Sequence, residues 1–412
     1  MKRRAVTYTL YALAVGLIAV AAAAMPHLRP KSPIVTAPLE PPTPPTVAPT
    51  PPPPVEPVVQ APPEPETPEI EVVFALDTTS SMTGLIDGAK RKIWSLVGFI
   101  SSGQPKPHVK VGLVAYRDVG DAYVTRFYDL SDDIDAVFGH LRALRAEGGG
   151  DTPEHVAKAL HDAVNRTSWS SGPKVAKMIY LVGDAPPHSD YNDGYDYPAL
   201  AKRAAAKGIH LNTIRCGDDS ETGSVFRQIA RLGHGQYATV DGSGGVADTA
   251  TPFDEKMAML NKKLIGTAVG YGRSAGTMGH KASSVSMGLG GMGFGVAADR
   301  AEYAARKGVA LDGEDDLIGR IGTLGKGAGA VNAMPAAALP APLQAMKPEE
   351  REAFVAQKVA ERKEVVEEIN ALAAKRDTYM KAARAKAPRK DGFDDSVRKT
   401  IADQASGVTS FH

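Results

Sequence analysis

Hydroxyl and carboxylate side chains alternate where an apolar segment of this chain ends. The sequence FALDTTSSM, residues 74–82, places Asp77, Thr79 and Ser81 on alternate positions. In an extended chain, residues two apart point the same way, so these three side chains can converge on one point. Oxygen ligands without His or Cys suit Mg²⁺ or Mn²⁺ rather than zinc. The segment therefore predicts part of a divalent-cation site.

Two later segments carry further oxygen ligands. GGGDTPE places Asp151 and Thr152 directly before a predicted helix, and LVGDAPPH places Asp184 at the end of a predicted strand. Ligand-binding groups of open α/β sheets gather where strands end at their carboxyl edge. We therefore expect Thr152 and Asp184 to join the cation site, with Asp151 just outside the ligands.

The balance of hydroxyls and carboxylates has an electrostatic consequence. Hydroxyl ligands are neutral, so a shell with only two or so carboxylates leaves the cation largely uncompensated. Such a cation can draw a carboxylate of another molecule into an open coordination position. A simpler interpretation also exists, because Asp77, Ser81 and Thr152 could cap the helices that follow them and Asp184 could hold a turn.

Short apolar segments alternate with amphipathic ones around these residues. IEVVFALD, from Ile70, is typical of a strand buried on both faces, and residues 85–100 repeat apolar side chains at helical spacing. Further strands are predicted at 109–118, 123–130, 177–184, 209–217 and 235–240, with helices between them. The alternation predicts one doubly wound, mostly parallel α/β domain over residues 70–265.

The motifs, taken together, resemble a known family. The strand VVFALD, the pattern Asp77-x-Thr79-x-Ser81, the downstream Thr152 and the Asp184 of GDAPPH resemble the von Willebrand factor type A domain with its metal-ion-dependent adhesion site. The family pattern is Asp-x-Ser-x-Ser, then a Thr, then an Asp. Here Thr79 replaces the first Ser and keeps the hydroxyl.

This resemblance implies both a fold and a function for residues 70–265. It implies a six-stranded, Rossmann-like sheet with one short antiparallel edge strand, for which 123–130 is the candidate. It also implies that the hydroxyls of Thr79, Ser81 and Thr152 contact the metal, that the two Asp residues contact it directly or through water, and that an acidic residue of a protein partner completes the shell.

The loop HSDYNDGYDYP, residues 188–198, follows Asp184 on the same face. Tyr is an efficient interface residue, so Tyr191, Tyr195 and Tyr197 are expected on a partner-binding rim together with His188 and Asp151.

Because domains of this family are usually binders, we expect a non-enzymatic protein. Two alternatives stay open. The first is a structural envelope protein that oligomerises through its C-terminal helix and whose metal only stabilises the fold. The second is a hydrolase in which His188 is the base for a metal-bound water.

The N-terminus predicts export. Three basic residues at positions 2–4 precede about 20 uncharged residues, so residues 1–24 form either a cleaved signal peptide or a retained membrane anchor. The basic end stays cytoplasmic, and the rest is exported. The only cysteine, Cys216, cannot form an internal disulfide. Export without disulfides fits the bacterial cell envelope, either as a single-pass inner-membrane protein or as a periplasmic one.

Composition separates the remaining regions. Residues 25–69 hold more than half of the 31 prolines and predict a Pro-rich, extended linker. A net charge of +1 gives no general attraction to nucleic acid.

Residues 266–347 are rich in Gly and Ala and predict low order apart from a short helix at 297–308. The string GLGGMG within them has no surrounding βαβ unit, so no cofactor site is expected there.

A long amphipathic helix is predicted over residues 348–387, followed by a tail over 388–412. Its apolar stripe consists of Val355, Val359, Val366, Ile369, Ala373 and Met380. The stripe is explained either by packing of the helix on its own domain or by a coiled-coil homo-oligomer.

Overall fold

The fold is described from a computed structural model of the 412-residue chain, for residues 67–150, 152–240, 249–313, 315–386 and 393–411. The chain divides after Pro62, and the described residues belong to the second unit, Pro63–His412. The predicted signal or anchor over 1–24, and nearly all of the predicted linker over 25–69, lie outside the described residues. No helix within the described residues is long and apolar enough to span a bilayer.

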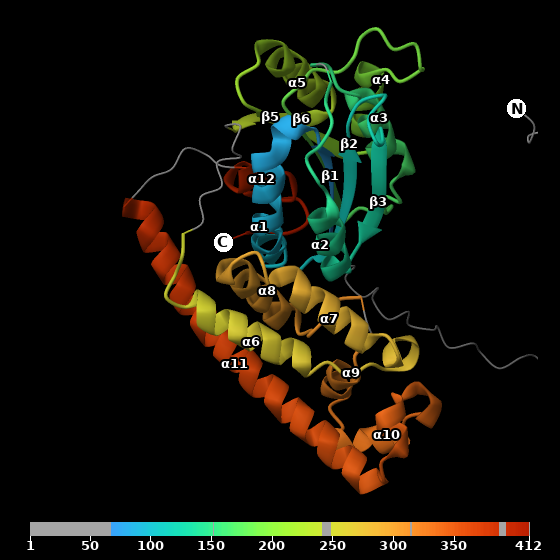
Figure 1. Cartoon of the computed structure of the whole chain (residues 1–412), viewed down its shortest axis with the longest axis vertical. Coiled ribbons are helices and arrows are strands. Elements are labelled where there is room, and N and C mark those ends of the chain that lie inside the picture. The colour runs from blue at the N-terminus through green and yellow to red at the C-terminus, as the bar shows by residue number, and fades with distance from the viewer. Residues whose placement is uncertain (1–66, 151, 241–248, 314, 387–392, 412) are drawn as a thin grey trace, which may run out of the picture. The chain divides into compact units, whose positions relative to one another are not determined.

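A six-stranded sheet forms the centre of the second unit, in the order β3-β2-β1-β4-β5-β6 (Figure 1). The strands are β1 (Glu69–Asp77), β2 (His108–Tyr116), β3 (Thr125–Ser131), β4 (Val175–Gly183), β5 (Ile209–Cys216) and β6 (His234–Val240). Only β3 runs antiparallel to its neighbour, and the other pairs are parallel. The predicted fold class is confirmed, including the antiparallel edge strand.

Helices cover both faces of this sheet because the central strands are apolar on both faces. Alternate β1 residues, such as Val72 and Phe74, pack against α1 (Thr83–Ile100) and α2 (Ile134–Ala143). The residues between them, Val73 and Ala75, pack against the other layer. That layer consists of α3 (Val156–His161), α4 (Tyr197–Ala206) and α5 (Ser220–Leu232).

The last helix, α12 (Phe393–Gln404), returns to the sheet and packs on the same face as α1. The side-chain amides of Asn212 on β5 and Gln404 donate to each other at 2.9 and 2.7 Å. Gln104 and Ser410 then pair through their backbones. The expectation of a C-terminal tail over 388–412 is therefore wrong for α12, which covers part of the sheet.

Residues 254–386 form a helical region instead of the low-order segment expected for 266–347. Its helices are α6 (Asp254–Gly266), α7 (Met278–Leu289), α8 (Phe294–Lys307), α9 (Leu317–Leu324), α10 (Ala341–Ala345) and α11 (Pro348–Lys386), with short 3₁₀ segments at Gly272–Ala275, Ala328–Ala333 and Ala336–Ala338. Buried Ala298 and Ala301 of α8 pack against Leu260 of α6. Small residues allow such close helix packing, so the high Gly and Ala content does not indicate disorder here.

The helical region is joined to the sheet domain by a buried ion pair. Arg300 on α8 is 1% exposed and donates from Nε and one Nη to the two carboxylate oxygens of Asp135 on α2, each at 2.8 Å. Burial alone would raise the pKa of Asp135, but the charge and hydrogen bonds of Arg300 hold it below its ordinary value. The ring of Trp94 on α1 lies 5.4 Å from that of Tyr303, between centroids.

The apolar stripe of α11 packs inside its own chain. Val355, Ile369 and Ala373 are buried against α6, α8, α9 and the 3₁₀ segment Ala328–Ala333. Val365 is buried in place of the predicted Val366, which is only partly buried. Because the same face cannot also form an intermolecular seam, the structure favours packing on the chain's own domain over a coiled coil.

Candidate functional site

Asp77, Thr79 and Ser81 lie together at the carboxyl end of β1. Thr79 donates to Asp77 Oδ1 from its backbone N–H at 2.9 Å and from its hydroxyl at 2.7 Å. The hydroxyl oxygens of Thr79 and Ser81 are 3.3 Å apart. Thr79 has an extended backbone, with φ −72° and ψ 165°, so its side chain points the same way as that of Asp77. Ser81 lies in the 3₁₀ turn Ser80–Met82, and this turn, not an extended chain, brings its hydroxyl close to that of Thr79.

The second carboxylate oxygen of Asp77, Oδ2, is buried and accepts no hydrogen bond from any of the residues that the structure describes. Burial, only partly offset by the two hydrogen bonds from Thr79, raises the pKa of Asp77 to about 7, and the charge of Asp184 adds to the rise. A buried carboxylate without a partner is costly unless a cation or donor reaches it. A carboxylate with one free oxygen, whose other oxygen is bonded to the Thr79 hydroxyl, fits a hard divalent cation.

The end of β4 brings Asp184 toward the same place. Asp184 is half-buried, and its backbone carbonyl accepts a hydrogen bond from Thr222 on α5 at 3.2 Å. A Cβ on the preceding residue, Gly183, would lie 2.4 Å from Tyr116 Oη and 3.4 Å from Asp77 Oδ2. Glycine at this position therefore leaves room for the Tyr116 hydroxyl, whereas the distance to Asp77 is an ordinary van der Waals contact. Burial raises the pKa of Tyr116, and the negative charges of Asp77, Glu154 and Asp184 raise it further.

The Gly-rich loop before α3 lies over the residues that follow β1. The backbone carbonyl of Gly148 accepts hydrogen bonds from Ser80, at 2.7 Å from the hydroxyl and 3.3 Å from the N–H. A Cβ on Gly149, whose φ is +83°, would lie 3.2 Å from the Cβ of Thr79. Thr152 follows in this loop and is exposed, whereas Asp151 lies outside the described residues.

Glu154 is an acidic residue near the site that the motif analysis missed. It is 3% exposed, and one of its carboxylate oxygens lies 3.7 Å from the position of a Cβ on Gly149. Its backbone N–H donates to the carbonyl of Pro186, and its carbonyl accepts from His188 N–H. An acidic residue just before a helix is usually explained by its favourable interaction with the helix N-terminus. The sequence therefore gives no sign that the side chain of Glu154 is buried.

The expected rim residue His188 is buried, with a side chain that is 8% exposed. Its Nε2 lies 3.3 Å from Asp118 Oδ2, and its Nδ1 lies 2.8 Å from Asp190 Oδ1. Its ring is stacked on that of Tyr191, with centroids 3.9 Å apart, and Tyr191 Oη donates to Asp118 Oδ2 at 2.7 Å. His188 therefore holds the loop 188–198 in place. The prediction that it faces a partner is wrong for its side chain.

Tyr195 and Tyr197 are half-buried. The ring of Tyr195 lies 4.9 Å from that of His161 and 5.9 Å from that of His155, between centroids. His155 Nε2 is 2.8 Å from Asp193 Oδ2, and burial lowers the pKa of His155 despite the acidic groups nearby. These contacts attach the loop before α4 to α3.

Residues at the end of β2 also belong to this edge and were missed. Arg117 is 3% exposed and donates from Nε to the carbonyl of Thr78 at 3.1 Å, and from Nη to the carbonyl of Arg145 at 2.8 Å. Arg117 therefore links the loop after β1 to the loop before α3. Long-range contacts of this kind leave no local pattern in a sequence.

Clusters of three or more His, Cys, Asp or Glu side chains able to hold a metal are absent from the described residues. The candidate ligand set is of another kind, because it combines three hydroxyls with the carboxylates of Asp77 and Asp184.

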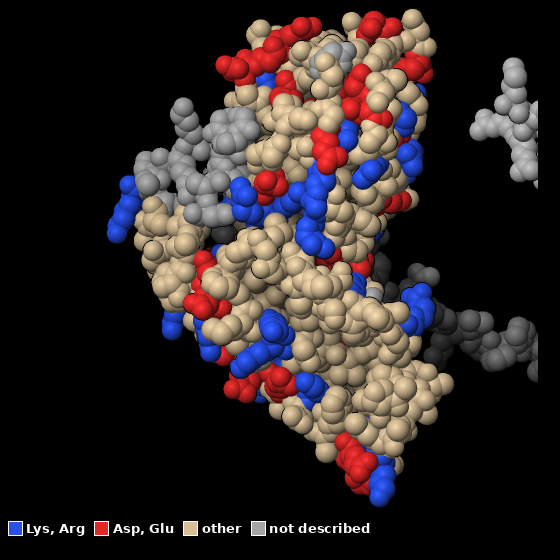
Figure 2. Space-filling view, in the orientation of Figure 1, with Lys and Arg blue, Asp and Glu red and all other residues tan. Residues whose placement is uncertain are grey.

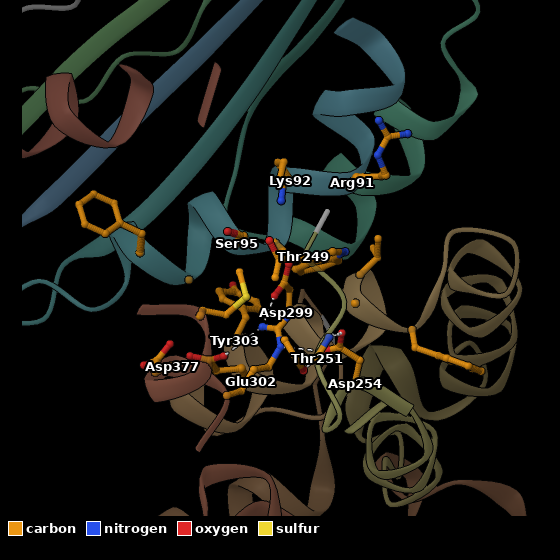
Figure 3. A pocket seen from close by; sticks show the side chains of 18 of the residues that line it. Arg91, Lys92, Ser95, Thr249, Thr251, Asp254, Asp299, Glu302, Tyr303 and Asp377 are labelled. Carbon is orange, nitrogen blue, oxygen red and sulfur yellow. Dashed lines mark hydrogen bonds and ion pairs between the residues drawn. The ribbon is translucent and has the colours of Figure 1, made fainter. Parts of the chain in front are cut away.

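A separate cavity of about 910 Å³ lies beside the C-terminal half of α1 (Figure 3). Asp254, Asp299 and Glu302 line it from the helical region, and Lys92 lines it from α1. Arg376 on α11 donates to Asp254 at 2.7 Å and to Asp299 at 2.5 Å. The candidate cation residues precede the N-terminus of α1, so this cavity is a different place.

Comparison with known proteins decides the kind of domain. Residues 71–243 match the family model of the von Willebrand factor A domain. The chain contains a von Willebrand factor A domain. Such a domain points to a role in protein interaction or adhesion, and the six-stranded sheet described above is the von Willebrand factor A fold.

Curated relatives match the chain over part of its length. An ariadne-like RING finger protein R811 of Acanthamoeba polyphaga mimivirus is 27% identical over 123 residues, which are 30% of this chain and 12% of that protein. Hemicentin-2 of Mus musculus is 29% identical over 175 residues, which are 41% of this chain and 3% of that protein. The chain thus spans about an eighth or less of the length of these relatives.

Solved structures with a similar fold include BatB, a conserved hypothetical protein of Bacteroides thetaiotaomicron, at 20% identity and a TM-score of 0.32 over 42% of this chain and 90% of that one. The SpRpn10 von Willebrand factor A domain matches at 12% identity and a TM-score of 0.32, over 42% of this chain and 89% of that one. Proximal thread matrix protein 1 of the mussel byssus matches at 14% identity and a TM-score of 0.33, over 43% of each chain.

Proposed function

We propose that this chain is a non-enzymatic binding protein that captures a protein partner through Mg²⁺ or Mn²⁺ at the carboxyl end of β1. Asp77, Thr79 and Ser81 would hold the cation together with Thr152 and Asp184. The observation that carries the proposal is Asp77 Oδ2, which is buried and accepts no hydrogen bond within the described residues, while the other oxygen of the same carboxylate accepts from the Thr79 hydroxyl, 3.3 Å from that of Ser81.

The cation, when bound, would supply an open coordination position for a carboxylate of the partner. The chain's own residues prepare the site for it. Asp77 Oδ1 accepts from the hydroxyl and the backbone N–H of Thr79, and these two bonds fix the orientation of that side chain. Because Thr79 and Ser81 are neutral, they orient the ion without cancelling its charge.

The position of His188 favours binding over hydrolysis. Its Nδ1 is within hydrogen-bond distance of Asp190, its Nε2 lies 3.3 Å from Asp118 Oδ2 without a hydrogen bond in the described residues, and Tyr191 covers the ring. A general base must be within hydrogen-bond reach of the water that it activates. A side chain held between two Asp residues and a Tyr ring is suited to fixing a loop.

A second candidate function follows from the same buried oxygen. If the cation only compensates the charge of Asp77, the site is structural, and the metal stabilises the fold without contacting a partner. The two functions differ in what a chelator removes: partner capture in the first case, and only stability in the second.

We further propose that residues 1–24 export the chain to the bacterial cell envelope, as a retained anchor or a cleaved signal. The charge pattern of this segment supports export. Fractionation of cells that express the full chain, with N-terminal sequencing of the mature protein, tests the proposal. Recovery of the intact chain in the cytosol would contradict it.

Calorimetric titration of MgCl₂ and MnCl₂ into residues 63–412, which form one compact unit, tests cation binding. Ser81→Ala should weaken binding by at least about tenfold, as expected for the loss of a ligand. Ser284→Ala, at an exposed position on α7, is the matched control and should leave the affinity unchanged. Absence of heat with both metals would refute the cation site.

Capture from envelope extracts then separates the two candidate functions. Partner binding should disappear with chelator and with Asp184→Ala. If capture persists under both conditions while the free energy of unfolding falls, the structural role is correct and the adhesive role is not.

A further inference from the structure

The loops around Asp77 expose many acidic side chains and few basic ones. Within the described residues of the loops 117–124, 144–155, 184–197 and 217–219 and the first turn of α5, the exposed acidic residues, here called the acidic rim, are Glu147, Asp190, Asp193, Asp196, Asp218, Asp219 and Glu221. Among Lys and Arg side chains in these loops, only Arg145 is exposed, because Arg117 is buried. Figure 2 shows acidic side chains gathered over the end of α5 and beside α4.

This distribution is a property of one edge of the sheet and not of the whole chain. The chain as a whole has 48 Lys and Arg against 47 Asp and Glu, for a net charge of +1. The acidic rim therefore makes a local negative field at the edge where β1 and β4 end. Charges lining one surface act together on an approaching molecule within about one Debye length, roughly 8–10 Å at physiological salt.

Part of the acidic rim is used to hold the loops. Asp219 caps α5 by accepting from Thr222 N–H at 2.7 Å, and Asp190 contacts His188. In contrast, no hydrogen bond or ion pair within the described residues engages the side chains of Asp196, Asp218 or Glu221. Asp196 and Glu221 lie at the N-termini of α4 and α5, where negative charge is favourable, but exposed acidic side chains kept close together also repel one another.

The buried oxygen of Asp77 is the second observation that points to a ligand at this edge. It is an unpartnered acceptor in a fully buried side chain, and the rim loops surround it. A divalent cation held by Asp77 would lie inside the site and not among the rim side chains, so the charges of Asp196, Asp218 and Glu221 would remain uncompensated. A partner that offers a carboxylate must then overcome repulsion from the rim.

We propose that the partner segment is basic, with one Asp or Glu that reaches the cation and Lys or Arg on both sides that face the acidic rim. This inference rests on the proposed function and names the chemistry of its partner. Val119, which is 58% exposed in the loop after β2, gives the aliphatic part of a Lys or Arg side chain an apolar surface to cover. The same field repels nucleic acid and anionic membranes.

A library of heptapeptides with a fixed central Asp and random flanks, displayed on beads, tests this proposal with residues 63–412. Selection in MgCl₂ followed by elution with chelator should enrich Lys and Arg on both sides of the Asp. Enrichment of neutral or acidic flanks would overturn the basic-partner inference and leave cation-dependent capture standing. If no peptide binds in a magnesium-dependent way, both proposals are wrong.

A charge-neutralised variant gives an independent measurement. The triple substitution Asp196→Asn, Asp218→Asn and Glu221→Gln should lower the association rate of an enriched peptide about tenfold at low salt and weaken its salt dependence. Magnesium affinity, measured by calorimetry, should stay within a few-fold, because these side chains are not ligands. The matched control is Glu349→Gln, Glu364→Gln and Glu367→Gln on the exposed face of α11. Equal rates for the rim and control variants would overturn the proposal.

Discussion

Replacing Asp77 by Asn is expected to stabilise the metal-free protein at alkaline pH. Asn keeps an oxygen that can accept both hydrogen bonds from Thr79, but it removes the buried negative charge. The pKa of Asp77 is raised from 3.8 to about 7 in the folded protein. The ionised carboxylate therefore destabilises the fold wherever the pH exceeds its unfolded pKa.

The size of this effect follows from linkage between protonation and folding. Below pH 4 the carboxyl is protonated in both states and contributes nothing. Between pH 4 and pH 7 the unfolded state loses its proton first, so stability falls as the pH rises, and above pH 7 the loss is constant. At 1.36 kcal/mol per pKa unit, the loss is about 4 kcal/mol at pH 8 and about 2 kcal/mol at pH 5.

Urea unfolding of residues 63–412 in chelator at pH 5 and pH 8 measures the difference. The Asp77→Asn protein should be more stable than the wild type at both values, with the larger gain at pH 8. The control is Asp218→Asn, an exposed acid on the same edge, which should change the free energy of unfolding by less than about 0.5 kcal/mol.

Adding Mg²⁺ should reverse the order at pH 5, where the wild type starts about 2 kcal/mol behind, and should narrow the difference at pH 8, where it starts about 4 kcal/mol behind. The wild type gains about 2.7 kcal/mol at a magnesium concentration of 100 times its Kd, whereas the Asn variant, with a weakened site, gains less. If the variant is less stable than the wild type by the same amount at both pH values in chelator, Asp77 carries no uncompensated charge, and the argument for a cation fails.

Three further substitutions test the contacts that position the site. Asp135→Asn leaves Arg300 buried without its counter-charge and should cost about 3–5 kcal/mol of unfolding free energy in a denaturant titration, whereas a well-packed apolar pair at both positions should lose much less. Gln404→Ala breaks the amide pair with Asn212 and should cost about 1–3 kcal/mol, with increased hydrogen exchange in α12; unchanged exchange there would contradict its attachment to β5. The pKa of Asp162 is lowered because hydrogen bonds from neighbouring side chains outweigh the effect of burial. Its contribution is present above about pH 4 and is lost as the pH falls further, so Asp162→Asn should destabilise at pH 7, and a deficit that is constant from pH 7 to pH 2.5 would contradict this assignment.

Predictions from the sequence succeeded where the cause is local. The strand that ends at Asp77, the helix that follows it and the meeting of Asp77, Thr79 and Ser81 all depend on residues near one another in the chain. The antiparallel edge strand was expected from the family resemblance, and the structure contains it at Thr125–Ser131. The binding of a cation by these residues stays a prediction.

The helical region shows where composition misleads. The high Gly and Ala content predicts low order over residues 266–347, yet α7, α8 and α9 lie there. Small side chains fit a tightly packed helix pair as well as they fit a loop. The buried ion pair of Arg300 with Asp135 holds this segment as packed helices and not as a loop. The two residues are 165 positions apart, so no local sequence pattern indicates their contact.

The sequence by itself determined the order of strands and helices in the sheet domain and the alternation of oxygen-bearing side chains after β1, because backbone periodicity and side-chain direction depend on neighbouring residues. Only the tertiary structure decided that Glu154 is buried while Thr152 is exposed, that His188 lies beneath Tyr191, and that α12 covers the sheet. These outcomes depend on which distant segments pack against one another. The packing of the whole domain determines those contacts, and no single segment of the sequence does.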